Sequence, residues 1–275
     1  MRPRPIHTKT RGQRHGFIRR LVSPGDLGAR LKPFVFLDHV EGVIEPGTGF
    51  GWHPHSGIAT LTYSLNSDAA YEDTTGQRGI IEATGLEWMR AGGGTWHQGF
   101  IHPRAPTTTA FQLWIALPPG VEDGPSQGIY VAPGDVPQVN NVRVLLGSYE
   151  GHTNPIPAPS PMAYLDVVLG RGESFTYAPP PGHDVAWVCV YQGRAQVSGD
   201  DVERELVVFA EGDEPLTFRA IDDVRLLVGS AQKHPYPLVL GSHSVHTNAA
   251  SLARGVARIR EVGAQLHQRG NGSAT

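Results

Sequence analysis

The chain has 275 residues, 18% of them charged, and a formal net charge of -3, which excludes a general electrostatic attraction to nucleic acid or to a membrane surface. This length allows two domains or one large one. The single cysteine, Cys189, excludes an intrachain disulfide and is expected as a small buried hydrophobe. No apolar run approaches the ~20 residues that span a bilayer, and the N-terminus lacks the apolar stretch of a secretory signal, so a cytoplasmic protein is expected.

Short segments rich in β-branched and aromatic residues, separated by glycine and proline, predict strands in the first half of the chain. The expected strands are residues 34–37, 58–65, 79–83, 86–89 and 110–117. Residues 117–135 are rich in proline and glycine and lack apolar periodicity, which predicts a connection between two halves.

A second series of strand-like segments follows this connection. The expected strands are residues 142–146, 164–169, 185–191, 205–209 and 224–228. Residues 58–67 and 184–193 are similar in strand length and in ending at a turn, which indicates a weak internal duplication. The sequence therefore predicts an all-β protein of two β-sandwich domains, residues 1–135 and 136–275.

One helix is expected, at the end of the second domain. Asn248 could cap a run from Ala249 to about His267 that carries apolar residues on one stripe. Gly255 and Gly263 weaken such a helix, so we expect it to be held by packing against the sheets.

Three histidines form the candidate metal site. His53 and His55 lie two residues apart on extended backbone, so their imidazoles point to the same face. His97 follows a glycine-rich turn and could reach the same cavity. Imidazole nitrogens suit divalent transition metals, so we expect one such ion per chain, with Fe(II), Ni, Co, Cu, Mn and Zn all compatible with these ligands.

The residues of six motifs resemble the pirin family of the cupin superfamily: LDH at 37–39, HPHSG at 53–57, EWM at 87–89, AGGG at 91–94, WH at 96–97 and FQLWIALP at 111–118. The segment LGSHSVHTN at 240–248 is similar to the end of a pirin, so the resemblance spans most of the chain. It implies a bicupin, with two packed β-sandwich or jelly-roll barrels and a C-terminal helix. It also implies one metal, with Fe(II) first among the candidates, in the N-terminal barrel and none in the other, where Pro179 and Pro181 align with His53 and His55.

The chain departs from the family pattern in its carboxylate ligand. The family's Glu two residues after the later His carries over onto Gly99, and the position where other cupins place a Glu is Ala59. Three neutral imidazoles would leave the charge of the ion uncompensated by protein. Such a site should favour an anionic ligand such as an enolate, phenolate, carboxylate or hydroxide.

Several side chains near the proposed ligands could wall a substrate pocket or, equally, fill a sandwich core: Phe36, Phe50, Trp52, Trp88, Met89 and Trp96. All of these except Trp96 are candidate pocket residues, together with Gln98. Gln98 follows His97 directly, so strand alternation sends it to the opposite side unless the strand bulges. Asp38, His39 and Glu87 could act behind the ligands, although a solvated carboxylate is the favoured interpretation of Glu87.

Two functions are compatible with these residues. The resemblance implies a metal-dependent dioxygenase for an acidic enol or phenol, since several pirins act as quercetin 2,3-dioxygenases, although the absent Glu would take the substrate proton in that chemistry. The alternative is a non-catalytic metal-dependent binding or regulatory module that contacts other proteins, and a vestigial site is a third interpretation. The expected partner is a small anionic or aromatic substrate or a protein; a membrane and nucleic acid are not expected.

Overall fold

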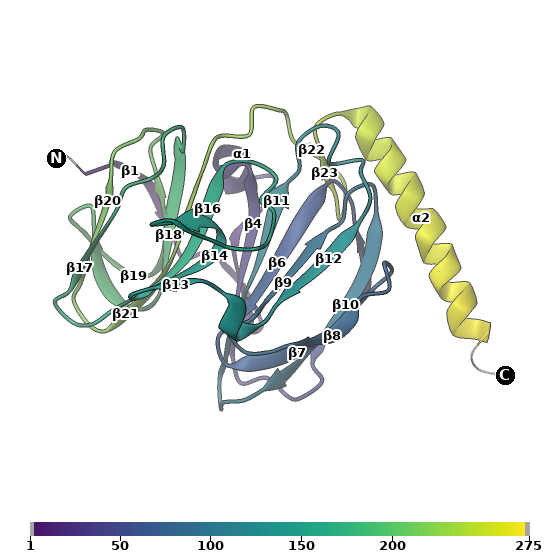
Figure 1. Ribbon diagram of the computed structural model, residues 1–275, viewed down its shortest axis with the longest axis horizontal. Helices are drawn as coiled ribbons and strands as arrows, with labels where there is room; N and C mark the ends of the chain where they lie inside the picture. The colour runs from purple at the N-terminus through teal and green to yellow at the C-terminus, as the bar shows by residue number, and fades with distance from the viewer. Residues whose placement is uncertain (1–2, 273–275) are drawn as a thin grey trace. The chain divides into compact units, whose positions relative to one another are not determined.

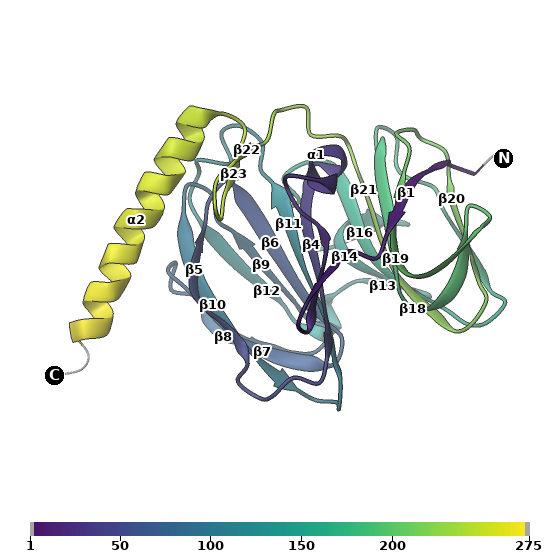
Figure 2. The ribbon, with the colours of Figure 1, turned by 180° about the vertical axis from the view of Figure 1, so that it is seen from behind.

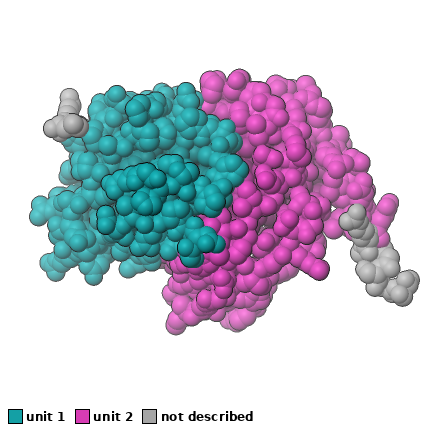
Figure 3. Space-filling view, viewed as in Figure 1, with its two compact units in different colours: residues 1–13, 31–33, 134–233 teal, residues 14–30, 34–133, 234–275 magenta. Residues whose placement is uncertain are grey.

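The computed structural model describes residues 3–272, which form two compact units (Figures 1 and 3). Unit 1 contains residues 1–13, 31–33 and 134–233, and unit 2 contains residues 14–30, 34–133 and 234–275. The predicted boundary at residue 135 lies close to the observed one, because residue 133 belongs to unit 2 and residue 134 to unit 1.

The chain ends belong to the opposite units from those that the sequence predicted. Strand β1 (Ile6–Thr10) joins unit 1 because it pairs antiparallel with β19 (Asp200–Phe209) at the edge of that unit's sheet. The terminal helix α2 (Ala249–Gly272) joins unit 2 because it packs against strands of that unit. The compact units therefore differ from the predicted limits 1–135 and 136–275 at both ends of the chain.

Two antiparallel sheets build most of unit 2. The larger has the strand order β12-β9-β6-β11-β4-β3-β2 and the smaller has the order β5-β10-β7-β8. The strands of the larger sheet are β2 (Gln13–His15), β3 (Ile18–Val22), β4 (Phe34–Gly42), β6 (Ile58–Ser64), β9 (Leu86–Arg90), β11 (Thr108–Ala116) and β12 (Gln127–Val131). Those of the smaller are β5 (Gly49–His55), β7 (Ser67–Asp73), β8 (Arg78–Ile81) and β10 (Thr95–Pro103).

The two faces of the larger sheet differ in character, as the period of two along a strand requires. Leu61 lies opposite Leu113 and Trp88 on the neighbouring strands, and all three side chains are buried. Thr62, one residue further, lies opposite Gln112 and Glu87 on the other face. One face of the sheet is thus an apolar core, and the other carries polar groups.

Unit 1 contains a sheet of order β1-β19-β18-β21-β16-β14-β13, to which β15, β17 and β20 attach. Its remaining strands are β13 (Gln138–Val139), β14 (Val142–Tyr149), β15 (His152–Thr153), β16 (Met162–Leu169), β17 (Ser174–Tyr177), β18 (Val185–Val197), β20 (Leu216–Ala220) and β21 (Val224–Ala231). Valine, leucine and phenylalanine side chains from these strands form its core. Cys189 on β18 is buried, as predicted.

Helix α2 begins at the predicted cap, where the backbone N–H of Ser251 donates to Asn248 Oδ1 at 2.9 Å. It lies beside β5 and β10 in both ribbon views (Figures 1 and 2). The glycines expected to weaken it are its contact points: a Cβ on Gly255 would lie 2.6 Å from His246 Nε2, and one on Gly263 would lie 2.8 Å from Trp96 Cζ2. Packing therefore holds the helix, as expected.

The remaining elements are short. They are α1 (Leu27–Leu31), the 3-10 helix Pro133–Asp135, and the paired strands β22 (Val239–Leu240) and β23 (Val245–His246). Neither α-helix in the described part of the chain is long and apolar enough to cross a membrane.

Candidate metal centre

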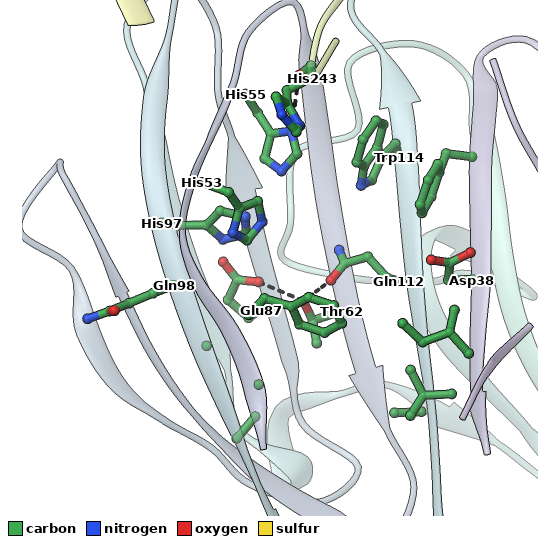
Figure 4. Close-up of a pocket in the computed structure, with 18 of the residues that line it drawn as sticks. Asp38, His53, His55, Thr62, Glu87, His97, Gln98, Gln112, Trp114 and His243 are labelled. Carbon is green, nitrogen blue, oxygen red and sulfur yellow. Dashed lines mark hydrogen bonds between the residues drawn. The ribbon is translucent and has the colours of Figure 1, made fainter. Parts of the chain in front are cut away.

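The three predicted histidines meet at the junction of β5 and β10. The two strands are antiparallel neighbours, and His97 lies directly opposite His53. One ligand nitrogen from each of His53, His55 and His97 lies within 4.8 Å of the other two (Figure 4). Among residues 3–272, this is the one group of three or more histidine, cysteine or acidic side chains close enough to share an ion.

Backbone carbonyls orient two of these imidazoles. Nδ1 of His53 lies 2.8 Å from the carbonyl oxygen of Gly51, and Nδ1 of His55 lies 3.1 Å from that of His243. A carbonyl oxygen can only accept, so each Nδ1 carries the hydrogen and each Nε2 presents its lone pair. Nε2 of His97 is also buried and has no hydrogen-bond partner.

Burial keeps the cluster uncharged. Desolvation, reinforced by neighbouring His53, lowers the pKa of His55 to about 3. Desolvation also lowers the pKa of His53, and it takes the pKa of His97 well below its ordinary value, with His55 adding to the effect. Neutral imidazoles with converging lone pairs and an unpartnered buried nitrogen fit a divalent transition metal.

Neither of the two positions at which cupins carry a glutamate ligand has a carboxylate in this chain. Gly99 lies on β10 just after a register shift, and Ala59 is buried in β6. A Cβ on Gly99 would meet only the carbonyl oxygen of Ala70, at 3.4 Å, so space does not exclude a side chain there.

The histidines line a cavity of about 820 Å³ within unit 2. Of the side chains predicted to wall a pocket, Phe36, Phe50 and Gln98 line it. The structure does not bring the other three to the cavity wall: Trp52, Trp88 and Met89. Trp52 alternates with His53 along β5, whereas Trp88 and Met89 are buried in the core.

Gln98 lies at the bulge in β10 but does not join the histidines. Its Nε2 donates to Glu72 Oε2 at 3.0 Å, and the side chain points away from the cluster (Figure 4). It is a wall residue without a visible role in coordination.

A stacked pair of aromatic rings forms the cavity wall beside the histidines. The rings of Phe36 and Trp114 stack with centroids 4.0 Å apart, and His55 meets Trp114 edge-on at 4.8 Å. On the other side of Phe36, the guanidinium of Arg20 lies 4.0 Å from the ring centroid. Trp114 was not among the predicted pocket residues, although its place two residues after Gln112 on β11 puts both on the cavity face.

The expectation of a solvated Glu87 is wrong. The side chain lines the cavity and is only 5% exposed, and burial raises its pKa to about 7. Thr62 Oγ1 lies 2.9 Å from Glu87 Oε2 and 3.0 Å from Gln112 Oε1.

Asp38 and His39 behave differently because they alternate along β4. Asp38 lines the cavity and forms a two-point ion pair with Arg20. Burial raises the pKa of Asp38, and the Arg20 guanidinium opposes that rise. The ring of His39 stacks on Phe111, with centroids 4.6 Å apart, and does not line the cavity.

A buried Ser–His–Glu chain secures the segment that orients His55. Ser56 Oγ lies 2.9 Å from His246 Nε2, and His246 Nδ1 lies 3.1 Å from Glu122 Oε2. This order of groups occurs in hydrolases, but here the hydroxyl is fully buried and donates to Ser244 Oγ at 2.8 Å. The chain therefore acts as an anchor between β5 and the segment before α2.

An antiparallel β-sandwich with inward histidines on adjacent strands defines the cupin class, and the second β-rich unit makes the chain a bicupin. Comparison with known proteins extends this result. The sequence model of the family described as Pirin matches residues 17–115. A Pseudomonas aeruginosa protein with the provisional name quercetin 2,3-dioxygenase is 32% identical over 238 residues, covering 81% of this chain and 82% of that protein. The chain belongs to the pirin family.

Other similarities agree with this assignment. A pirin-like protein of Caulobacter vibrioides is 34% identical over 66% of this chain and 67% of its own length. A crystal structure described as quercetin 2,3-dioxygenase from Acinetobacter baumannii has a TM-score of 0.85 at 25% identity, covering 93% of this chain and 96% of that one. The Escherichia coli pirin YhhW in complex with nickel(II) shares the fold, with a TM-score of 0.66 at 19% identity over 84% of this chain and 98% of that one.

Proposed function

We propose that the chain binds one divalent transition metal, iron foremost, on His53, His55 and His97. We further propose that it acts as a dioxygenase for acidic enols or phenols, in the manner of a quercetinase. The observation that carries the proposal is the convergence of three neutral imidazoles at the wall of an aromatic-lined cavity of about 820 Å³. The name of the Acinetobacter baumannii neighbour supports the choice of reaction class.

A bound metal would supply a positive centre for an anionic oxygen and for chemistry with dioxygen. The protein's own contribution is selective binding. Three neutral ligands leave the positive charge of the ion uncompensated, so ligands that arrive as anions are favoured. Such ligands have already lost the proton that the family's glutamate, here Gly99, would otherwise remove.

The aromatic wall would orient the ligand. Both faces of the Phe36 ring are covered, one by Trp114 and the other by Arg20, so a planar ring system would meet the edges of this stacked pair. Since Trp114 also contacts His55, a ring on this wall places its substituents next to the histidines.

A non-catalytic binding module is the second candidate, and Gly99 is the observation that favours it. Without a carboxylate at that position, the metal would serve to stabilise unit 2 and its surface for a protein partner.

The deciding experiment is the metal content of protein purified without a histidine tag. We expect about one transition-metal ion per chain in the wild type and in the exposed-residue control His152→Ala, and none in His97→Ala. Iron-loaded protein should then consume oxygen with quercetin or with an acidic β-diketone. Metal in the wild type without oxygen uptake would favour the binding module, and no metal in either protein would refute the centre.

A further inference from the structure

A row of three polar side chains crosses the cavity face of the larger sheet beside the histidines. Glu87 on β9 lies opposite Thr62 on β6, which in turn lies opposite Gln112 on β11. All three line the cavity that contains the histidines (Figure 4). The row is continuous, because the Thr62 hydroxyl is within hydrogen-bond distance of both neighbours.

Thr62 has one hydroxyl hydrogen for two acceptor contacts. The hydroxyl of Thr62 has one hydrogen, and Oε1 of Gln112 can only accept, so that hydrogen lies between Thr62 and Gln112. Thr62 Oγ1 cannot donate its one hydrogen to both oxygens at once, so both contacts are satisfied when the Glu87 carboxyl carries a hydrogen. Burial raises the pKa of Glu87 to about 7, which allows this state near neutral pH.

This arrangement leaves one strong donor unused. Nε2 of Gln112 is buried and has no hydrogen-bond partner. In Figure 4 the amide nitrogen points into the space between the histidines and Trp114, away from Thr62. An unpaired buried N–H group destabilises the folded protein, so a ligand that brings an acceptor oxygen to this point relieves that cost.

We propose that Gln112 is a specificity-determining residue, whose side-chain Nε2 donates to a carbonyl oxygen of the ligand, with Thr62 and Glu87 as positioning residues. The proposal rests on the function above for the ligand class and deepens it. The cavity takes planar aromatic compounds that carry both an acidic hydroxyl and a carbonyl on one ring system. The hydroxyl faces the histidines, the rings contact Trp114, and the carbonyl faces Gln112.

Binding to the metal-free protein tests this assignment independently of catalysis. The probes are 3-hydroxyflavone, which has a carbonyl beside its hydroxyl, and 2-naphthol, which has a hydroxyl alone. The dissociation constants are measured by tryptophan fluorescence. We expect Gln112→Leu to weaken 3-hydroxyflavone about tenfold, the equivalent of one lost hydrogen bond of about 1.4 kcal/mol, and to leave 2-naphthol unchanged.

Variants of the positioning residues separate orientation from general stability. Glu87→Gln keeps a donor for Thr62 Oγ1, so 3-hydroxyflavone should bind as in the wild type. Thr62→Val removes the tether of Gln112 and should weaken 3-hydroxyflavone but not 2-naphthol. The exposed substitution Gln192→Leu in unit 1 is the matched control and should change neither constant.

Equal dissociation constants of 3-hydroxyflavone for the wild type and Gln112→Leu would overturn the proposal. An equal loss of affinity for both probes in Gln112→Leu would also overturn it. So would a wild type that does not bind 3-hydroxyflavone, or a Glu87→Gln variant that binds it as weakly as Thr62→Val. Failure of the metal or oxygen experiments would refute the proposed reaction without changing these constants, so the two failures are distinguishable.

Discussion

Replacing Glu87 with glutamine should remove a pH-dependent loss of stability from unit 2. Burial raises the pKa of this carboxyl from 4.5 to about 7 in the folded protein. Below the lower value the carboxyl is protonated in both folded and unfolded chains, so it adds no pH dependence. Between the two values only the folded chain holds the proton, so the free energy of unfolding decreases as pH rises, until the carboxyl ionises in both states.

The size of this loss follows from the pKa difference. Each pKa unit is worth about 1.36 kcal/mol, so the shift to about 7 determines the size of the effect. Between about pH 5 and about pH 8, the free energy of unfolding of the wild type should fall by about 2.5 kcal/mol relative to that of Glu87→Gln. Glutamine keeps the donor to Thr62 but cannot ionise.

The assay is urea unfolding of metal-free protein, followed by tryptophan fluorescence, to which Trp88 and Trp114 of unit 2 contribute. The exposed substitution Glu203→Gln in unit 1 is the control and should follow the wild type at every pH. Parallel stability profiles of the wild type and Glu87→Gln across this pH range would show that Glu87 is not protonated in the folded protein.

Three further substitutions test the surroundings of the histidines. Gly99→Glu restores the family's carboxylate at a position where a Cβ would meet only the carbonyl oxygen of Ala70. The variant should retain its metal more tightly than the wild type in competition with a chelator, and unchanged retention would show that position 99 is too far from the ion. Gly255→Ala forces a Cβ against Ser56 and should cost about 1–3 kcal/mol in urea unfolding, whereas wild-type stability would show that α2 can shift. Glu122→Gln places an amide group among hydrogen-bond donors and should lower the free energy of unfolding by about 1–3 kcal/mol in the same assay. Unchanged stability would show that the buried Ser–His–Glu chain is dispensable.

The histidine cluster and the cap of α2 could be predicted because local rules determine them. The period of two along a strand puts His53 and His55 on one face, and Asn248 precedes the helix that it caps. Composition alone did not mark β5 and β10, because glycine, proline and histidine replace β-branched residues in much of them; extended backbone was expected there only around the histidines.

The polar row could not be predicted, because alternation gives two faces without saying which is exposed. Thr62 and Gln112 alternate with buried apolar residues, which is the pattern of a strand with one face in water. Only the second sheet of unit 2 makes that face the wall of a cavity. The same limit explains the error at Glu87, whose burial depends on strands distant in sequence.

The N-terminal segment belongs to unit 1 and the C-terminal segment to unit 2, which has a practical consequence for studying the units separately. A fragment that stops at residue 135 would lack the His243 carbonyl that orients His55 and the helix that covers Ser56. The complementary fragment would lack β1 and expose the edge of β19, where a strand of another molecule could pair. Neither half is an autonomous module in sequence order, so work on isolated units requires circular permutation or co-expression in place of simple truncation.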